Sequence, residues 1–162
     1  MTASIGSMGS ARTISRRAMD EVRRHSEEEY PHECCGVIVA TGDDARVIRV
    51  RNVQDEMHAS DPLTYPRTAR TAYVGHPADL REALDLADRP GGSLVAFYHS
   101  HPDHDSYFSA EDTEQATPFG EPSYPDALQL VVSVYDRRIH EIKAFSWSAD
   151  AGAYVETPLE EN

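Results

Sequence analysis

One apolar segment that runs directly into two histidines constrains the fold of this chain most strongly. Residues 94–98 (Leu-Val-Ala-Phe-Tyr) predict a buried strand that continues into His99 and His101. Side chains two residues apart on a strand point to the same face, so we expect both imidazoles to project together. Val95 and Phe97 should lie behind them on that face. The pattern therefore predicts a sheet with a polar site at the end of a buried strand.

A short helix after this strand would add a carboxylate. Ser109 can cap a helix from Ala110 to about Thr117, and Asp112 would lie one turn into it, on the same side as Ser109. Ser-x-x-Asp is also a capping-box pattern in which the acid only completes the cap, and the two roles are compatible. Two imidazoles and one carboxylate on a zinc ion leave a fourth position for water, as in catalytic sites.

Composition and charge exclude several classes of protein. The chain has 162 residues, enough for one domain with a core, and carries 15 Lys and Arg against 28 Asp and Glu, for a net charge of −13. Such a surface repels phosphate backbones, so we expect no nucleic-acid partner. No apolar run is long enough to span a membrane, and residues 1–15 lack the apolar core of a signal peptide. Cys34 and Cys35 are adjacent and form no disulfide framework, which favours a cytoplasmic location.

Periodicity and turn residues predict an α/β (α+β) domain around one central sheet. We expect residues 1–13 to be a flexible N-terminal segment and residues 14–158 to form the domain. Residues 52–66 and 118–125 are expected to be irregular. The helices are expected at 15–29, 76–89 and 110–117, and the strands at 36–40, 45–51, 71–74, 94–99, 127–135, 139–147 and 153–157.

The combined pattern resembles the motif of the JAMM (MPN+) metalloproteases. His99-x-His101, seven residues, Ser109, two residues and Asp112 match its His-x-His-Pro and Ser-x-x-Asp parts. The family also has an upstream Glu in a Pro-x-Glu-x-Cys-Gly setting, which residues 31–36 (Pro-His-Glu-Cys-Cys-Gly) match. The resemblance covers about residues 14–147. It implies a JAB/MPN-type fold, similar to that of cytidine deaminase, in which helices flank a central mixed sheet.

The resemblance also implies a role for each matched residue. His99, His101 and Asp112 would hold one Zn²⁺ per chain. Glu33 would act as general base on the attacking water and then deliver the proton to the leaving amine. Ser109 would donate a hydrogen bond to the oxygen that becomes negative.

Other residues compete for these roles. For Glu33 the residues alone favour a solvated acid at a helix end, because three glutamates (residues 27–29) lie nearby. Glu111 is a rival base, although a neighbour of the third ligand on a helix would point elsewhere. His104 and Asp105 could bind a second metal, but a mobile, turn-prone loop is the simpler interpretation.

Outside the motif, structural roles are the simpler expectation. Cys34 and Cys35 could bind a metal or act as nucleophiles. We expect instead that both cysteines are small buried residues at the start of a strand. Tyr98 should pack on the sheet face opposite the two histidines. Surface positions are expected for the remaining histidines, namely His25, His32, His58, His76 and His140.

The small prokaryotic members of the family imply the expected activity. They cleave amide bonds at the C-terminus of ubiquitin-like or sulfur-carrier proteins, some of which end in Gly-Gly. We therefore expect a zinc metallopeptidase or isopeptidase with such a partner. A non-catalytic MPN-type scaffold and a metallohydrolase for small amides are the alternatives. A homodimer is compatible with the sequence.

Overall fold

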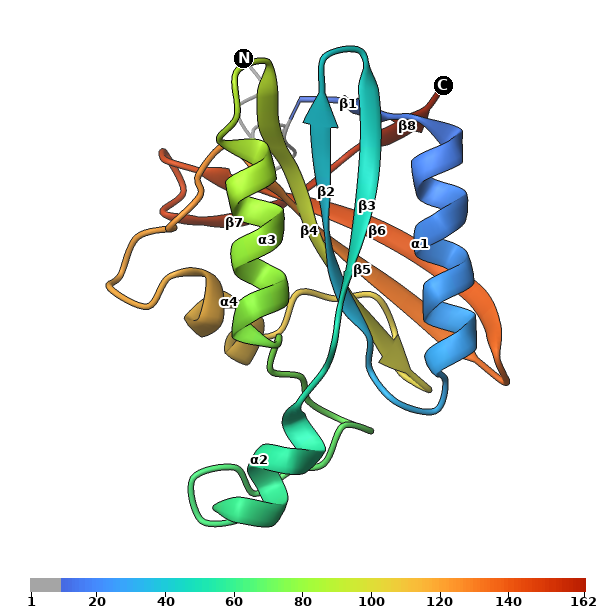
Figure 1. The fold of residues 1–162 in the computed structure, drawn as a ribbon, viewed down its shortest axis with the longest axis vertical. Helices are drawn as coiled ribbons and strands as arrows, with labels where there is room; N and C mark the ends of the chain where they lie inside the picture. Colours follow the sequence, from blue (N-terminus) through green and yellow to red (C-terminus); the bar gives the residue numbers. More distant parts are fainter. Residues whose placement is uncertain (1–9) are drawn as a thin grey trace.

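A six-stranded mixed sheet forms the centre of the computed structural model, which describes residues 10–162 (Figure 1). Its order is β3-β2-β4-β5-β6-β7, with β4 parallel to β5 and every other neighbouring pair antiparallel. This sheet confirms the predicted fold class. The strands are β2 (Cys35–Thr41), β3 (Asp44–Val50), β4 (Gly92–Pro102), β5 (Leu128–Tyr135), β6 (Arg138–Ser148) and β7 (Ala153–Thr157).

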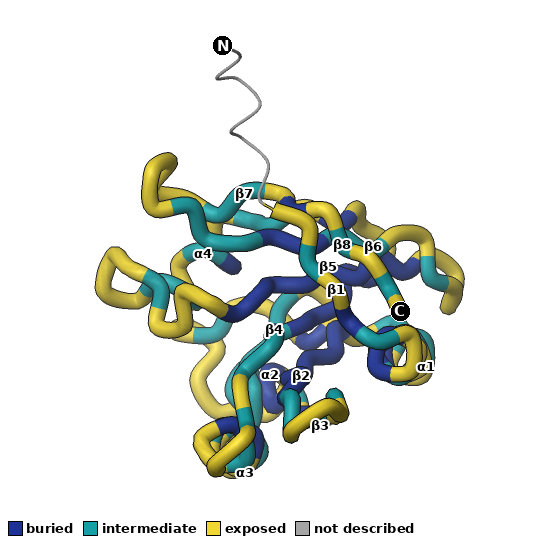
Figure 2. The backbone as a smooth tube through the Cα atoms, turned by 90° about the horizontal axis from the view of Figure 1, so that it is seen from above, coloured by how far each residue is buried: buried dark blue, intermediate teal, exposed yellow. Residues whose placement is uncertain are grey.

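Helices cover both faces of the sheet. α1 (Arg16–Glu29) lies against one face and α3 (Pro77–Ala87) against the other, while α2 (Gln54–Ser60) and α4 (Ala110–Ala116) are short (Figures 1 and 2). Ser15 caps α1 as predicted, because its side chain accepts a hydrogen bond from the backbone N–H of Ala18. None of the helices within residues 10–162 is long and apolar enough to cross a membrane.

The core consists of two apolar clusters, one on each face of the sheet. Met19 and Val22 of α1 pack on one face with Ile38 of β2. Val37 and Val39 of the same strand face the other way, toward α3. Successive side chains of β2 thus serve opposite clusters, as the pleat of a strand requires.

An irregularity in β4 moves one side chain to the unexpected face. The register against β2 pairs Ala96 with Ile38 and Leu94 with Val39, so Val95 is an extra residue in β4. Phe97 lies on the α3 face, as predicted, but Val95 packs into the α1 cluster. The expectation that Val95 shares the face of Phe97 is wrong, because the bulge reverses the alternation.

Tyr98 packs on the α1 face, as predicted, and this requires a glycine on the neighbouring strand. Gly36 pairs directly with Tyr98, and a Cβ atom on Gly36 would lie 2.3 Å from the tyrosine ring. Only glycine lets the ring cross β2 at this point. The glycine of the Cys-Gly pair is thus explained by packing.

Two local features differ from expectation. Residues 54–60 form α2, which the sequence did not predict because Val53 precedes it and offers no side-chain cap. Residues 71–74 form no strand, and only an isolated bridge joins Asn52 to Gly75. The carbonyl of Ala72 and the N–H of Val74 are bonded to the Asn52 side chain rather than to a neighbouring strand.

A second, two-stranded sheet joins the ends of the described chain. β1 (Arg12–Ile14) runs parallel to β8 (Leu159–Glu161). The predicted boundary between residues 13 and 14 therefore falls inside a strand, and β8 extends past the predicted end at 158. Residues 1–9 of the expected flexible segment lie outside the described residues.

Candidate metal centre

Three polar side chains converge where β4 meets the first turn of α4. Nε2 of His99 lies 3.1 Å from Nε2 of His101. The carboxylate oxygens of Asp112 lie 3.3 Å from His99 Nε2 and 3.6 Å from His101 Nε2. All three side chains are buried. Within residues 10–162 this is the one group of three or more His, Cys, Asp or Glu side chains close enough together to hold a metal ion.

Local structure aims the carboxylate at the two imidazoles. Ser109 Oγ accepts from the N–H of Asp112 at 3.0 Å, and Asp112 Oδ2 accepts from the N–H of Ser109 at 2.9 Å. This is the predicted capping box. The same bonds that start α4 therefore fix the direction of the Asp112 side chain.

The donor set suits a cation. Burial would raise the pKa of Asp112, but the hydrogen bonds of His101 and His99 hold it well below its ordinary range, so the carboxylate stays charged. Nδ1 of His101 lies 2.8 Å from the carbonyl oxygen of Asp105, which can only accept, so Nδ1 keeps a proton and Nε2 is the ring nitrogen that could bind a metal ion. A charged carboxylate and imidazole nitrogens facing one point fit a divalent metal ion.

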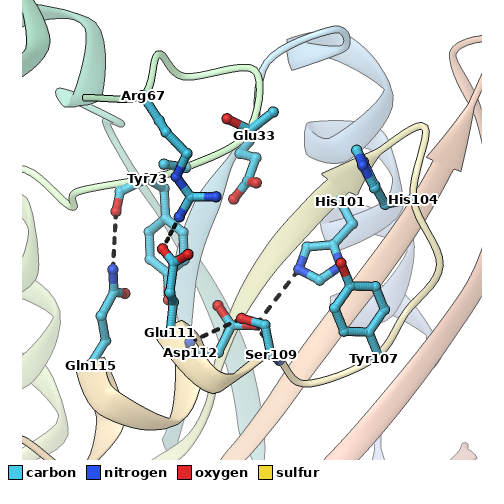
Figure 3. Close-up of a pocket in the computed structure, with 12 residues that line it drawn as sticks. Glu33, Arg67, Tyr73, His101, His104, Tyr107, Ser109, Glu111, Asp112 and Gln115 are labelled. Atoms are coloured by element: carbon cyan, nitrogen blue, oxygen red, sulfur yellow. Dashed lines mark hydrogen bonds and ion pairs between the residues drawn. The ribbon is translucent and has the colours of Figure 1, made fainter. Parts of the chain in front are cut away.

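A cavity of about 300 Å³ opens beside this group and includes Glu33 (Figure 3). Glu33 lies just before β2 and is 7% exposed. Burial is the main cause that raises its pKa to about 8, and the charge of Asp112 adds to the effect. The expectation of a solvated acid, drawn from the residues alone, is therefore wrong. Ser109 and Asp112 line the same cavity.

Residues that the sequence did not single out complete the cavity. Tyr73 stacks on the His99 ring at 4.7 Å between centroids, and Tyr107 packs on His101 at 5.1 Å. Arg67 forms an ion pair with Glu111, and both exposed side chains line the cavity, although Glu111 does not belong to the His99–His101–Asp112 group (Figure 3). Tyr107 lies inside the motif loop, but Tyr73 and Arg67 arrive through tertiary contacts and left no local signal.

The loop after β4 is tied down by hydrogen bonds. His104 Nδ1 lies 2.8 Å from the carbonyl oxygen of Pro102, and Asp105 accepts from the hydroxyl of Tyr135 at 3.0 Å. In the described part of the chain neither His104 nor Asp105 joins a group that could hold a second metal.

Cys34 and Cys35 are free and buried, as expected. Burial raises the pKa of the Cys34 thiol to about 11 and that of Cys35 further. Both side chains therefore stay as neutral thiols at neutral pH, which makes them poor nucleophiles.

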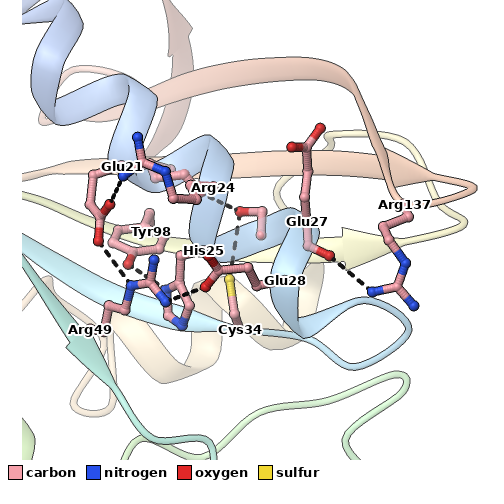
Figure 4. A network of polar contacts seen from close by, with 11 residues as sticks. Glu21, Arg24, His25, Glu27, Glu28, Cys34, Arg49, Tyr98 and Arg137 are labelled. Atoms are coloured by element: carbon pink, nitrogen blue, oxygen red, sulfur yellow. Dashed lines mark hydrogen bonds and ion pairs between the residues drawn. The ribbon is translucent and has the colours of Figure 1, made fainter.

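His25 contradicts the expectation of a surface position. It is 5% exposed, and its Nδ1 lies 2.7 Å from the hydroxyl of Tyr98 (Figure 4). Arg49 lies over this pair and is held by Glu21 and Glu28. Burial, aided by Arg49, lowers the pKa of His25 to about 4. His25 continues the helical spacing of Ala18 and Val22 on the buried face of α1, so the periodicity of the helix could have indicated its burial.

Two known proteins are similar to this chain in sequence over most of its length. The chain is 30% identical over 142 residues to the desampylase of Haloferax volcanii, covering 85% of this chain and 88% of that protein. It is 36% identical over 103 residues to the probable TtuB-protein conjugate cleaving protease of Thermus thermophilus, covering 64% of this chain and 62% of that relative.

Solved structures support the fold. A protein of Desulfitobacterium hafniense matches with a TM-score of 0.64 at 22% identity, covering 93% of each chain. A protein of Salinibacter ruber matches with a TM-score of 0.57 at 24% identity, covering 93% of this chain and 91% of the other.

The family model of prokaryotic homologs of the JAB domain matches residues 15–148. The chain therefore belongs to the prokaryotic JAB-domain family, as its motif indicated.

Proposed function

We propose that this protein is a zinc-dependent peptidase or isopeptidase that hydrolyses amide bonds at the C-terminus of a ubiquitin-like or sulfur-carrier protein. One observation carries the proposal. His99, His101 and Asp112 turn their donor atoms toward one point, and Glu33 lines the cavity beside them. A metal centre next to a buried carboxyl group is the arrangement that metal-assisted hydrolysis requires.

The three side chains would hold the zinc ion as two nitrogen ligands and one oxygen ligand. Such a set with an open fourth position is typical of catalytic zinc. When bound, the ion supplies Lewis-acid chemistry by acidifying a water molecule and polarising the scissile carbonyl. Asp112 contributes the negative charge, and the Asp105 carbonyl keeps the His101 ring in the binding tautomer.

Glu33 would move the proton in this reaction. Its carboxylate accepts a proton from the attacking water and delivers it to the leaving amine as the C–N bond breaks. A pKa of about 8, raised mainly by burial, makes both the charged and the protonated forms accessible near neutral pH. Its burial in the cavity also limits exchange of that proton with bulk water.

Ser109 would stabilise the oxygen that becomes negative. Its Oγ accepts from the N–H of Asp112 within the capping box, which leaves its own hydrogen available to donate. A hydroxyl so held needs little reorganisation during the reaction, and one such donor typically contributes on the order of 10²–10³ in rate.

The relatives support the substrate class. One is named desampylase and the other a protease that cleaves TtuB-protein conjugates, so we infer that a protein conjugate is also the substrate here. The C-terminal tail of the carrier, expected to end in Gly-Gly, would enter the cavity in an extended form. The exposed Arg67–Glu111 pair lines this cavity and would lie near the tail.

A panel of substrates tests this function. The purified zinc-loaded protein is incubated with ubiquitin-like carriers that bear an extension or an isopeptide-linked protein after Gly-Gly, and cleavage is followed by mass spectrometry. We expect cleavage after Gly-Gly that a zinc chelator abolishes. Binding of the carrier without zinc or cleavage would favour a scaffold, and cleavage of free dipeptides alone would favour a small-amide hydrolase.

A further inference from the structure

One side chain in the polar segment between β3 and α3 joins three parts of the chain. Asn52 Nδ2 donates to the carbonyl oxygens of Glu33 at 2.9 Å and Ala72 at 3.2 Å. Its Oδ1 accepts from the backbone N–H groups of Gln54 at 3.0 Å and Val74 at 3.1 Å. The side-chain amide thus uses both of its donors and accepts twice.

These four bonds require an asparagine-sized amide in one orientation. Exchanging Nδ2 and Oδ1 would set oxygen against two carbonyl oxygens and nitrogen against two N–H donors. An aspartate keeps the shape but lacks the donors, and alanine removes all four bonds. Asn52 is therefore specified by the backbone groups around it.

The first group that Asn52 holds is the main chain of Glu33. Glu33 precedes β2, so the ladder of the sheet does not position it. Its carbonyl accepts from Asn52, and its N–H donates to the carbonyl oxygen of Ala69 at 2.7 Å. Both backbone polar groups of Glu33 are thus bonded to the 52–75 segment. The position of its carboxyl group in the cavity depends on that segment.

The second group that Asn52 holds is the main chain on either side of Tyr73. Ala72 and Val74 are both bonded to the Asn52 amide, and the Tyr73 ring between them stacks on His99. The Tyr73 carbonyl also accepts from Gln115 of α4 at 3.4 Å. One amide therefore connects the residue proposed as base with the ring that packs on a proposed metal ligand.

We propose that Asn52 is a positioning residue, whose side-chain amide places Glu33 and Tyr73 relative to the His99–His101–Asp112 group. The proposal rests on the proposed function, because it assigns Asn52 an effect on the reaction through Glu33. Loss of the amide leaves the metal ligands intact, since β4 and α4 hold them without it. Loss of the Asn52 amide displaces the Glu33 carboxyl group, which is proposed to move the proton.

The expected effect falls on kcat. Misplacing a reacting group by about 1 Å can cost about 100-fold, so Asn52→Ala and Asn52→Asp should lower kcat by about 10- to 100-fold. KM should stay within about twofold, because neither variant removes a group from the cavity. The zinc content per chain should equal that of the wild type.

Thr157→Val is the matched control for stability. Thr157 is 2% exposed and its Oγ1 lies 2.5 Å from Ser146 Oγ, so this variant also loses a buried hydrogen bond. It lies on β7 and lines none of the cavity. All rates are measured well below the melting temperature of the least stable variant. The control should lose stability but keep kcat within about twofold of wild type.

A double variant tests whether Asn52 acts through Glu33. In a Glu33→Gln background, Asn52→Ala should lower kcat by less than about threefold, because the group that it positions is already disabled. A full 10- to 100-fold loss in that background would overturn the proposal. Unchanged kcat in both single variants, or a loss of zinc in proportion to the loss of activity, would also overturn it.

Amide hydrogen exchange supplies a readout independent of activity. Asn52→Ala should speed exchange at the backbone amides of Glu33 and Val74, and Thr157→Val should not. If the wild type cleaves no conjugate, the proposed function fails, but this measurement still decides whether Asn52 holds Glu33. Unchanged exchange at both amides would overturn the proposal.

Discussion

The two faces of β4 each bury a histidine site, and the two sites have opposite electrostatic characters. On one face His99 and His101 meet the Asp112 carboxylate beside an open cavity. On the other face His25 meets the hydroxyl of Tyr98 beneath Arg49 (Figure 4). The first site places a negative charge against imidazoles and suits a cation. The second buries His25 against a neutral hydroxyl and near the positive charge of Arg49, and both effects lower its pKa and keep it neutral.

This difference shows that burial alone does not make a histidine functional. Both sites are nearly removed from solvent, and burial by itself disfavours the charged imidazole in each. The two sites differ in a buried carboxylate. Asp112 is in direct contact with His99 and His101, whereas Glu21 and Glu28 near His25 are paired with Arg49. Substitutions that remove the distinguishing groups one at a time test this difference between the two faces.

The largest expected effect is loss of the metal. His99→Ala removes one of three donors and should reduce zinc from one per chain to a substoichiometric amount, with loss of cleavage. Tyr98→Phe is the matched control from the opposite face, since it removes only the hydroxyl that bonds His25. Metal analysis after dialysis measures the zinc content of both variants, and Tyr98→Phe should keep one zinc ion per chain. Full zinc content in His99→Ala would remove the distinction between the two faces.

Next in size is the effect of Ser109, which caps α4 and is also proposed to stabilise the oxyanion in the reaction. Ser109→Ala should lower kcat on the order of 10²–10³ and stability by about 1 kcal/mol. Ser109→Thr keeps a hydroxyl and should preserve most of both. Steady-state kinetics and thermal unfolding separate the two effects. If Ser109→Ala lost stability but retained wild-type kcat, the hydroxyl would only cap α4.

The His25 site should make stability depend on pH. Its pKa is about 4 in the folded protein and about 6.5 when unfolded, so the unfolded state binds the proton more tightly. The stabilisation is fully present above pH 6.5 and is lost as the pH falls through 4, by about 3 kcal/mol. Urea unfolding between pH 7 and 4 measures it for wild type and His25→Gln. Equal pH dependence in both proteins would contradict this assignment.

A smaller effect is expected from Gly36→Ala. The new Cβ would overlap the Tyr98 ring, and overpacking of this kind costs about 1–3 kcal/mol. Zinc content should not change, because the overlap lies on the face away from the metal ligands. Denaturant unfolding and metal analysis test the two parts. Unchanged stability would mean that the Tyr98 ring can move aside without cost, so that its packing and its contact with His25 are not tightly fixed.

Site residues that are placed by local sequence patterns could be predicted, whereas those placed by contacts between distant segments could not. His99, His101 and Asp112 could be predicted because strand alternation and a helix cap are local patterns. Glu33 could be found only through the family resemblance. Tyr73 gave no signal, because its place on His99 depends on contacts between distant segments.

The fold shows the same division. The long strands and α1 were predicted from periodicity and the cap at Ser15. β1 and β8 have three residues each, which is too short to show the alternation of apolar and polar residues that predicts a strand. α2 lacks a capping side chain, and Val95 changed faces at a bulge that no pattern in β4 revealed.

Glu33 is proposed to move the proton at a zinc centre held by His99, His101 and Asp112. The most direct test compares cleavage of a Gly-Gly-extended ubiquitin-like carrier by wild type and Glu33→Gln at equal zinc content. The wild type should cleave after Gly-Gly, and the variant should bind zinc but lose about 10²–10⁴ in rate. Equal cleavage by both zinc-loaded proteins would show that Glu33 does not move the proton.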